Sequence, residues 1–357
     1  MEKPDSYDVI VVGGGAAGLS GALTLARARR SVLVVDAGDP RNAPAGGVHM
    51  YLGRESTPPA ALLAADREEL RGYGGRVREG RAVAATRVGA EAPDAPGAPG
   101  GFRVDLEDGA ALHASRLLVT TGLTDELPAL PGLAACWGRD VLHCPYCHGW
   151  EVRDQPVGVL ATGMAAAVHQ ALLWRQWTAD LTLFAHTAGE PDDAAREQLA
   201  ARGVAVVAGE VTRLDTTGGR LTGVVLAGGR TVPVRALAVG PRLTARSGVL
   251  TGLGLTATEQ AMGDIVLGTR IAADPVTGAT AQPGVWAAGN VTNLGEQVIG
   301  AAAAGVRAGA AINADLIAAE VREAVAARRQ DGREPAGSMW TAGSAGTAGS
   351  AEGAGTR

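Results

Sequence analysis

Near its N-terminus the chain reads Tyr7-Asp8-Val9-Ile10-Val11-Val12-Gly13-Gly14-Gly15-Ala16-Ala17-Gly18. The apolar, β-branched first half is typical of a buried parallel strand. A glycine turn and a helical pattern over residues 16–30 follow, and a second strand over residues 31–35 ends on Asp36. Strand, G-x-G-x-x-G turn, helix, strand and acid in this order predict a dinucleotide-binding fold rather than a plain glycine turn.

The three glycines of the turn have separate tasks in such a fold. Gly13 permits the tight turn, Gly15 lets the backbone approach a pyrophosphate, and Gly18 lets the helix pack close to the strand. The start of the helix offers free N–H groups and the positive end of the helix dipole. Asp36 lies where a carboxylate accepts hydrogen bonds from a ribose, and the turn residues 39–42 follow on the nucleotide side.

The rest of the first domain is predicted as one helix and a run of strands. A helical pattern covers residues 58–73, and residues 76–121 read as a β-meander with an exposed or disordered loop at 92–101. The Pro-rich segment 127–132 predicts a linker, so we place a domain boundary near Leu123.

A second α/β unit follows this linker. Residues 157–160 form a strand that leads into a degraded copy of the nucleotide turn, because Ala161 stands where the first glycine is expected. The next strand, 181–185, is followed by no arginine that could hold a 2′-phosphate. Two hairpins with Gly-Gly turns close the unit, and residues 238–242 return the chain to the first domain.

Near the C-terminus, residues 284–290 predict a strand, and an alanine-rich helix runs from about Gln297 to Ala319. The start of that helix offers N–H groups to a ligand; simple packing through its Ala/Gly face is the alternative. The predicted fold is α/β, with two doubly wound, three-layer Rossmann-like nucleotide-binding domains, the second inserted in the first, and β-meanders. The predicted limits are 1–123 and 244–330 for the first domain, 124–243 for the second, and 331–357 for a disordered tail.

The run His143-Cys144-Pro145-Tyr146-Cys147-His148 holds two of the three cysteines. Thiols at C-x-x-C spacing can close a disulfide ring, which takes up two electrons when it is reduced and releases them when it is reoxidised. Half of a zinc site and two packed thiols are the alternatives, but no second C-x-x-C or H-x₃₋₅-H supplies the other ligands, so no metal is expected. His148 and His143 are candidate proton carriers; for His143 a hydrogen bond to backbone is the alternative. The third cysteine, Cys136, is expected to be an inert, partly buried thiol.

Composition narrows the classes of protein further. The chain has 357 residues, enough for two domains, and 46% of them are hydrophobic. A net charge of −5 argues against nucleic acid as a partner. No apolar run reaches membrane-spanning length, and the N-terminus lacks a signal-peptide layout. With three cysteines, a cytoplasmic location is expected, where a C-x-x-C is more often catalytic or metal-binding than structural.

From Tyr7 to about Ala319 the chain resembles the low-molecular-weight thioredoxin reductase family of two-domain flavoproteins. The run of residues 144–151 is similar to the dithiol oxidase branch, which includes the gliotoxin and holomycin disulfide-forming enzymes. The resemblance implies bound FAD and a homodimer. It also implies that Cys147 lies next to the flavin, that Cys144 exchanges with substrate, and that His148 takes the place of an acidic proton carrier.

The residues that the glycine turn and the resemblance together assign to FAD binding are Gly13, Gly14, Gly15, Ala16, Gly18, Asp36, Ala37, Arg41, Asn42, Val83, Thr121, Gly122, Gly289, Asn290, Gln297 and Val298. Asn290 replaces the usual aspartate, and its amide can still hydrogen-bond a ribityl hydroxyl. The Ala161 turn and the missing arginines argue against NADPH.

We therefore expect an FAD-dependent dithiol–disulfide oxidoreductase that oxidises a small-molecule dithiol through Cys144 and Cys147, with O2 as the acceptor. One alternative is a thioredoxin reductase that takes electrons from NADPH or a ferredoxin-like donor, with thioredoxin as partner. Another is a non-catalytic flavoprotein that sequesters a reactive dithiol.

Overall fold

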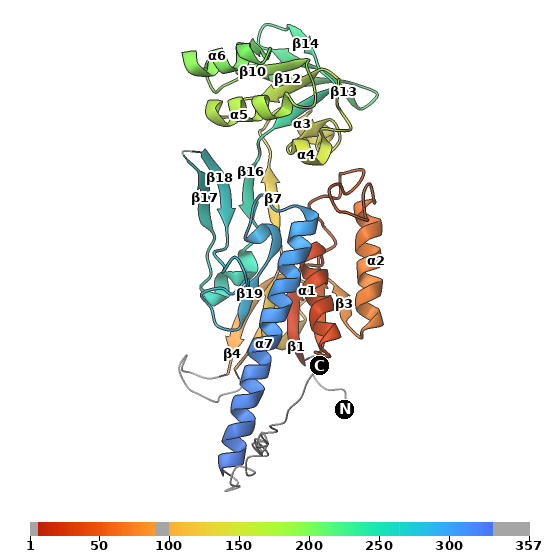
Figure 1. The fold of residues 1–357 in the computed structure, drawn as a ribbon, viewed down its shortest axis with the longest axis vertical. Coiled ribbons are helices and arrows are strands. Elements are labelled where there is room, and N and C mark those ends of the chain that lie inside the picture. Colours follow the sequence, from red (N-terminus) through yellow and green to blue (C-terminus); the bar gives the residue numbers. More distant parts are fainter. Residues whose placement is uncertain (1–5, 90–99, 264, 331–357) are drawn as a thin grey trace, which may run out of the picture. The chain divides into compact units, whose positions relative to one another are not determined.

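The structure is a computed structural model that describes residues 6–89, 100–263 and 265–330 (Figure 1). The chain divides into two compact units, residues 1–315 and 316–357. All strands and the candidate site lie in the first unit; the described part of the second is the remainder of helix α7. The loop predicted at residues 92–101 lies almost wholly outside the described residues, and the predicted tail, 331–357, lies outside them altogether.

The first sheet has seven strands in the order β3-β2-β1-β6-β5-β4, with β19 also paired to β6. Its strands are β1 (Ser6–Val12), β2 (Val32–Asp36), β3 (Arg76–Glu79), β4 (Ala82–Val88), β5 (Gly101–Leu106), β6 (Ala111–Val119) and β19 (Val285–Ala287). β1 pairs in parallel with both β2 and β6, as the alternation of strand, helix and strand predicts.

The predicted meander over residues 76–121 is wrong at both ends. β3 is not part of it, because it pairs in parallel with β2 at the opposite edge of the sheet. β4, β5 and the first half of β6 are antiparallel, whereas the second half of β6 pairs in parallel with β1 and β19. Strand propensity alone does not specify the partner, so the two kinds of pairing were not separable in the sequence.

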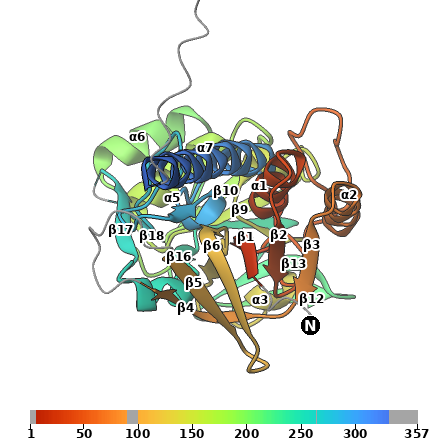
Figure 2. The same ribbon diagram turned by 90° about the horizontal axis from the view of Figure 1, so that it is seen from below.

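Helices cover one face of this sheet (Figure 2). The helices are α1 (Ala16–Arg27), α2 (Pro59–Gly72) and α7 (Val298–Gln330), so α7 continues eleven residues beyond the predicted end at Ala319. Leu118 of β6 faces α1, where it lies under Gly21. Its neighbours Leu117 and Val119 point to the other face, into a core shared with the 3₁₀ helix η1 (Gly248–Leu253).

Two short strands carry the chain out of the first sheet region and back. β7 (Leu123–Glu126) and β16 (Arg242–Ala245) pair antiparallel, and with β17 (Thr258–Met262) and β18 (Ile265–Arg270) they form a four-stranded sheet. The residues between β7 and β16 build their own sheets, which fits the boundaries expected near residues 123 and 243; the domain limits stay a prediction.

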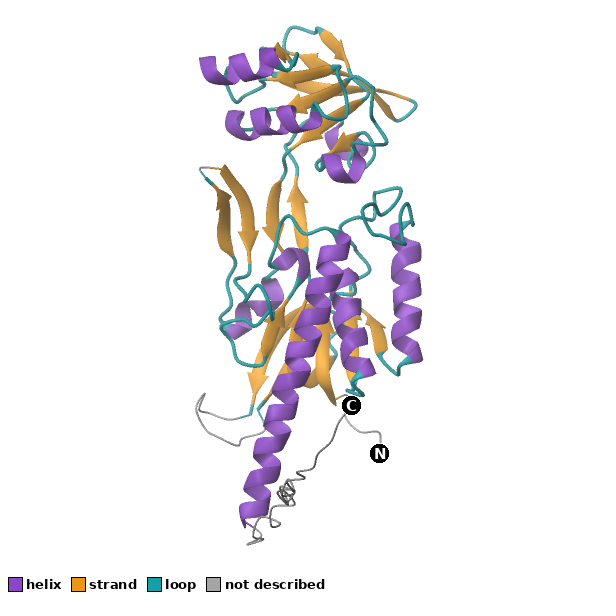
Figure 3. Ribbon diagram, viewed as in Figure 1, coloured by secondary structure: helices purple, strands orange, loops and turns teal. Residues whose placement is uncertain are grey.

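The inserted part has a five-stranded parallel sheet in the order β11-β10-β9-β15-β8 (Figure 3). The strands are β8 (Val141–Leu142), β9 (Val157–Leu160), β10 (Leu181–Phe184), β11 (Ala205–Val207) and β15 (Ala236–Val239), with helices α5 (Met164–Trp174) and α6 (Asp193–Ala201). The predicted Gly-Gly hairpins join β12 (Val211–Thr217), β13 (Arg220–Leu226) and β14 (Thr231–Pro233). The α/β class with two Rossmann-like units is confirmed.

Cys136 ends the short helix α3 (Leu133–Cys136) and is fully buried in the core of the inserted part. Burial raises the pKa of its thiol, and the nearby Asp140 raises it further. The burial is greater than the partial burial expected from the sequence, and the raised pKa favours the protonated thiol; its lack of reactivity stays a prediction. Within the described residues, no helix is long and apolar enough to cross a membrane.

The contact between α1 and α7 depends on Gly305. A Cβ built on Gly305 would lie 1.9 Å from the backbone oxygen of Ala17, which cannot move away. On Gly300, one turn earlier, a Cβ would meet only the flexible carboxylate of Glu296. We predict that Gly305→Ala lowers the free energy of unfolding by about 1–3 kcal/mol, the usual range for overpacking. Gly300→Ala is the matched control, expected near wild type in urea unfolding; equal effects would contradict the close contact.

Candidate active site

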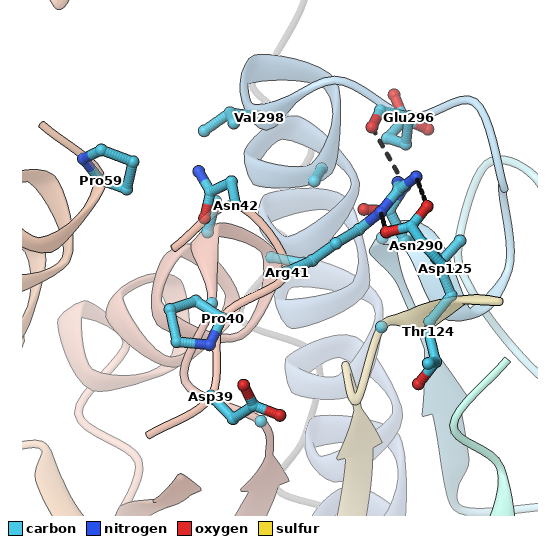
Figure 4. A pocket seen from close by; sticks show the side chains of 18 of the residues that line it. Asp39, Pro40, Arg41, Asn42, Pro59, Thr124, Asp125, Asn290, Glu296 and Val298 are labelled. Atoms are coloured by element: carbon cyan, nitrogen blue, oxygen red, sulfur yellow. Dashed lines mark hydrogen bonds and ion pairs between the residues drawn. The ribbon is translucent and has the colours of Figure 1, made fainter. Parts of the chain in front are cut away.

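A cavity of about 1030 Å³ lies beyond the carboxyl ends of β1, β2 and β6 and extends to the C-x-x-C segment. This is the edge at which parallel α/β sheets bind their ligands. Figure 4 shows the part of the cavity between the loop after β2, the strand β7 and the start of α7. Its volume suits a ligand as large as a dinucleotide, since typical ligand pockets measure about 300–1,000 Å³.

The glycine turn between β1 and α1 opens into this cavity. Gly13 has φ +108°, and a Cβ there would lie 2.5 Å from the backbone oxygen of Thr120. Gly18 packs against the carbonyl oxygen of Gly13, which a Cβ would approach to 1.9 Å. A Cβ on Gly15 would meet nothing within 4 Å, so this position faces free space in the cavity.

Asp36 closes the turn from the end of β2. Its Oδ1 accepts a hydrogen bond from the backbone N–H of Gly14 at 3.1 Å, and its Oδ2 accepts one from Arg67 at 2.5 Å. Arg67 comes from α2 and was not predicted to take part. Arg67 neutralises the Asp36 carboxylate, which is only 13% exposed. The polar groups of the turn that remain for a ligand at the cavity edge are therefore its backbone N–H groups.

Arg41 lines the cavity, but its guanidinium is already engaged (Figure 4). It donates two hydrogen bonds to the carboxylate of Asp125 on β7, at 2.8 and 2.7 Å, in the bidentate geometry typical of arginine. Arg41 can therefore bind FAD only through the atoms that the Asp125 carboxylate does not contact. The ion pair ties the loop after β2 to the strand that leads into the inserted part.

The other predicted cofactor residues also line the cavity: Ala16, Ala37, Asn42, Val83, Thr121, Gly122, Gly289, Asn290 and Val298. The hydroxyl of Thr121 donates to the backbone oxygen of Arg246, so only its backbone is free for a ligand. The Asn290 amide nitrogen donates to the backbone oxygens of Asn293 and Glu296, both at 3.1 Å. A carboxylate could not make these bonds, and they leave Oδ1 of Asn290 as the free acceptor.

The C-x-x-C forms one turn of helix, α4 (Pro145–His148), with Cys144 directly before it. Both thiols are free and half-buried, and both line the cavity. Gln297, at the start of α7, contacts the two of them. Its Oε1 accepts from the Cys147 thiol at 3.2 Å, and its Nε2 donates to the Cys144 sulfur at 3.6 Å. Gln297, which was expected to bind the cofactor, thus contacts both sulfurs.

The two sulfurs differ in their affinity for a proton. Interaction with the neighbouring Cys147 side chain lowers the pKa of Cys144 to about 6, against the effect of burial and with help from Gln297. The same interaction, together with burial and the charge on Cys144, raises the pKa of Cys147. In the reduced pair Cys144 is therefore the thiolate and Cys147 the thiol near neutral pH.

Both predicted histidines line the cavity in a half-buried to buried state. Burial is the main cause that lowers the pKa of His143 and of His148. Nδ1 of His143 lies 3.3 Å from the backbone oxygen of Val239, which corresponds to the backbone-bonded alternative. The carboxylate of Glu151 acts on His148 in the opposite direction and favours its protonated form.

The structure adds residues to this site that had not been assigned. His49 lines the same cavity, and it contacts Glu55 and Glu151. Glu151 ends the run of residues 144–151 on which the resemblance rests, so its position was visible, whereas His49 belongs to no motif. Within the described ranges, no group of three or more His, Cys, Asp or Glu side chains is arranged to hold a metal ion.

The second nucleotide turn differs from the first in its backbone. Ala161 is fully buried and donates its N–H to the backbone oxygen of Phe184 at 3.0 Å, as Gly13 does to the backbone oxygen of Val35 at 2.8 Å, so this bond is common to both turns. Ala161 lacks the positive φ that Gly13 has. Beyond β10, the ring of His186 accepts a hydrogen bond from the N–H of Val211 at 3.0 Å, and Arg196 is paired with Glu190 and Asp193.

A glycine turn open to a dinucleotide-sized cavity, with a cysteine pair at the other end of it, defines the class of flavin-dependent disulfide oxidoreductases. Comparison with known proteins agrees with this. A family model described as pyridine nucleotide-disulphide oxidoreductase matches residues 7–309. The chain belongs to this family and is thioredoxin reductase-like.

Individual relatives support the same assignment. Thioredoxin reductase tcpT of Claviceps purpurea is 35% identical over 50% of this chain, and the chain spans about half of it, 54%. Thioredoxin reductase sirT of Leptosphaeria maculans is 29% identical over 89% of this chain and 97% of its own length. The crystal structure of HlmI is 43% identical, with a TM-score of 0.84, over 93% of this chain and 99% of that one.

The protein is therefore an oxidoreductase and an FAD-binding flavoprotein, and the cavity fits that cofactor. We predict that Gly15→Val loses FAD, because a side chain there fills the free space to which the turn opens. Gly163→Val in the second turn is the matched control, since a Cβ there also meets nothing within 4 Å. Both variants should fold, as circular dichroism can check. Retention of yellow colour and of 450 nm absorbance by Gly15→Val would contradict the placement.

The asymmetry of the sulfurs predicts the order of alkylation in the reduced holoenzyme. Cys144 should react first with iodoacetamide, with a midpoint near pH 6, because thiolate forms as the pH rises through its lowered pKa. Gln297→Leu should move the midpoint to higher pH, since the amide donor to Cys144 is gone. Mass spectrometry of the alkylated peptide assigns the sulfur. Faster labelling of Cys147, or a midpoint at the ordinary thiol value of about 8.5, would contradict the prediction.

Proposed function

We propose that the protein is an FAD-dependent dithiol oxidase that converts a small-molecule dithiol into its disulfide, with molecular oxygen as the final acceptor. The observation that carries this proposal is the cysteine pair, with both sulfurs in contact with Gln297, at one end of the flavin-sized cavity. Bound FAD supplies a two-electron acceptor that oxygen can regenerate.

The first step is attack of a substrate thiolate on the Cys144 sulfur of the oxidised pair. A bond forms between the substrate sulfur and Cys144, and the Cys144–Cys147 bond breaks. Cys147 leaves and is protonated; its raised pKa makes it the slower leaving group of the two sulfurs and favours the protonated product.

The second substrate thiolate then attacks the first substrate sulfur and releases Cys144. A thiolate with a low pKa is the better leaving group, and Cys144, at about 6, meets this requirement. The substrate has lost two electrons and two protons. One proton stays on Cys147, and the other needs a base, for which His148 and His143 are our candidates.

The second nucleotide turn supports an oxidase over an NADPH-dependent reductase. Ala161 lacks the positive φ that shapes the first turn at Gly13, and it carries a Cβ where that turn has none. The segment after β10 is acidic, and its Arg196 already pairs with Glu190 and Asp193, so a 2′-phosphate has no guanidinium to bind. The printed names of several relatives favour the alternative, a thioredoxin reductase with thioredoxin as partner. A homodimer and a cytoplasmic location are part of the proposal.

Anaerobic titration of the holoenzyme tests this proposal. Dithiothreitol should bleach the flavin promptly in the wild type and in the control Cys136→Ser. It should fail to do so in Cys144→Ser and in Cys147→Ser, because disulfide exchange needs both sulfurs. NADPH should bleach the flavin slowly or not at all. Rapid stoichiometric bleaching by NADPH would overturn the oxidase and favour the reductase, and bleaching by dithiol in either serine variant would remove the cysteine pair from the mechanism.

A further inference from the structure

The loop between β2 and α2 places a histidine between two carboxylates at the cavity wall. Val48 and Thr57 form an isolated bridge, with the Val48 N–H donating to the Thr57 oxygen at 2.8 Å. The turn between them brings Glu55 back to His49, whose Nδ1 lies 2.5 Å from Glu55 Oε1. The second oxygen of Glu55 accepts the backbone N–H of Met50 at 3.0 Å.

The backbone of this turn is strained where it makes the reversal. Met50 and Ser56 both have φ +59°, a left-handed conformation that costs free energy in residues with a side chain. The backbone N–H of Ser56 also donates to the oxygen of Val48, which fixes the turn. The strained residues flank the segment that holds Glu55 against His49, so the orientation of the imidazole is specified by the fold.

The other ring nitrogen of His49 is free to act on the cavity. Nε2 lies 3.6 Å from Glu151 Oε1, longer than a hydrogen bond but within ion-pair distance for a protonated ring. The side chain is only 16% exposed and lines the same cavity as Cys147 and His148. With Nδ1–H donating to Glu55, the neutral ring presents Nε2 as a proton acceptor.

The proposed chemistry requires such an acceptor. Oxidation of a dithiol releases two protons, and the reduced cysteine pair keeps only one of them, on Cys147. We propose that His49, held by Glu55, is a second acid–base residue of the site, which takes the substrate proton in concert with His148. This inference rests on the proposed function of the cysteine pair.

The two histidines are coupled through their surroundings. After burial, the main influences on the pKa of His148 are Glu151, which raises it, and His49, which lowers it. Glu151 thus favours a proton on either ring, while a proton on one ring opposes a proton on the other. The charged and titratable groups facing His49 are Glu55, Glu151 and His148.

A purely structural role for His49 would be to fasten the loop to Glu55 and to the C-x-x-C helix. His49→Gln separates the two roles, because glutamine keeps hydrogen bonds to the carboxylates and cannot take a proton near neutral pH. His113→Gln is the matched control: His113 is exposed on β6 and does not line the cavity. Glu55→Gln keeps the hydrogen bond to His49 and removes the charge that stabilises the protonated ring.

The measurement is the rate at which dithiothreitol reduces the Cys144–Cys147 disulfide of the holoenzyme, over about pH 5 to 8, where imidazole titrates. Samples are quenched with acid and freed of dithiothreitol. They are then alkylated with iodoacetamide at alkaline pH in denaturant and counted by mass spectrometry, so the readout is thiol content and does not depend on turnover. A general base is worth about 10²–10⁴-fold in rate, and because His148 remains we expect a loss of about tenfold in His49→Gln near pH 7. In Glu55→Gln the acid side of the profile should move to lower pH, because the ring loses a proton more readily.

A profile for His49→Gln that coincides with that of His113→Gln, with the wild type reduced normally, would overturn the inference and leave the proposed function standing. Failure of dithiothreitol to reduce the wild type would instead reject the proposed function. If His49→Gln loses its flavin or the circular dichroism spectrum of the folded protein, Glu55→Gln becomes the test of the inference. An unchanged pH profile in Glu55→Gln then overturns it.

Discussion

The site depends on one contact, the amide of Gln297 placed between two sulfurs. An amide has a donor end and an acceptor end, so it cannot treat the two cysteines alike. Its oxygen accepts from Cys147 and its nitrogen donates to Cys144, which adds to the stabilisation of a thiolate on Cys144. The largest cause of the difference in pKa between the two sulfurs is their interaction with each other. The difference in pKa between the two sulfurs decides which one is the better leaving group and which one is protonated after the exchange.

The contact brings together parts of the chain that are far apart in sequence. Gln297 lies 150 residues from Cys147, just before α7, whereas the cysteines belong to the inserted part. The first part of α7 is held against α1 by Gly305, and the strand leading to the cysteines is fixed to the loop after β2 by the Arg41–Asp125 ion pair. Packing of small residues and one partly buried ion pair thus position the sulfur pair relative to the amide.

Much of the fold could be predicted from local patterns. The β1 turn and Asp36 specify the nucleotide fold because each requirement falls within a short stretch, and the structure places Gly13, Gly15 and Gly18 in the geometry that their spacing requires. The neighbour with which each strand pairs was harder to predict from the sequence. β3 is parallel to β2 rather than part of a meander, and α7 continues to Gln330, since neither pairing nor helix length is set by propensity alone.

The side-chain partners of the site were the least predictable part. The cysteines and their flanking histidines were visible in the sequence as one run. In contrast, His49 contacts Glu55 only because a strained turn folds back, and Arg41 in the loop after β2 pairs with Asp125 on β7. Such pairs depend on tertiary contacts that no local pattern encodes. The substitution of Asn290 also has a structural reason, since its amide donates to two backbone oxygens that an aspartate would leave without a donor.

Trapping the first covalent intermediate tests the central claim, that electrons enter through Cys144. The oxidised holoenzyme is mixed with a bulky monothiol, which cannot complete the second exchange, and is quenched with acid before fragmentation by mass spectrometry. The account predicts that the mixed disulfide lies on Cys144 and that the freed thiol is Cys147. An adduct on Cys147, or an equal division between the two sulfurs, would contradict it.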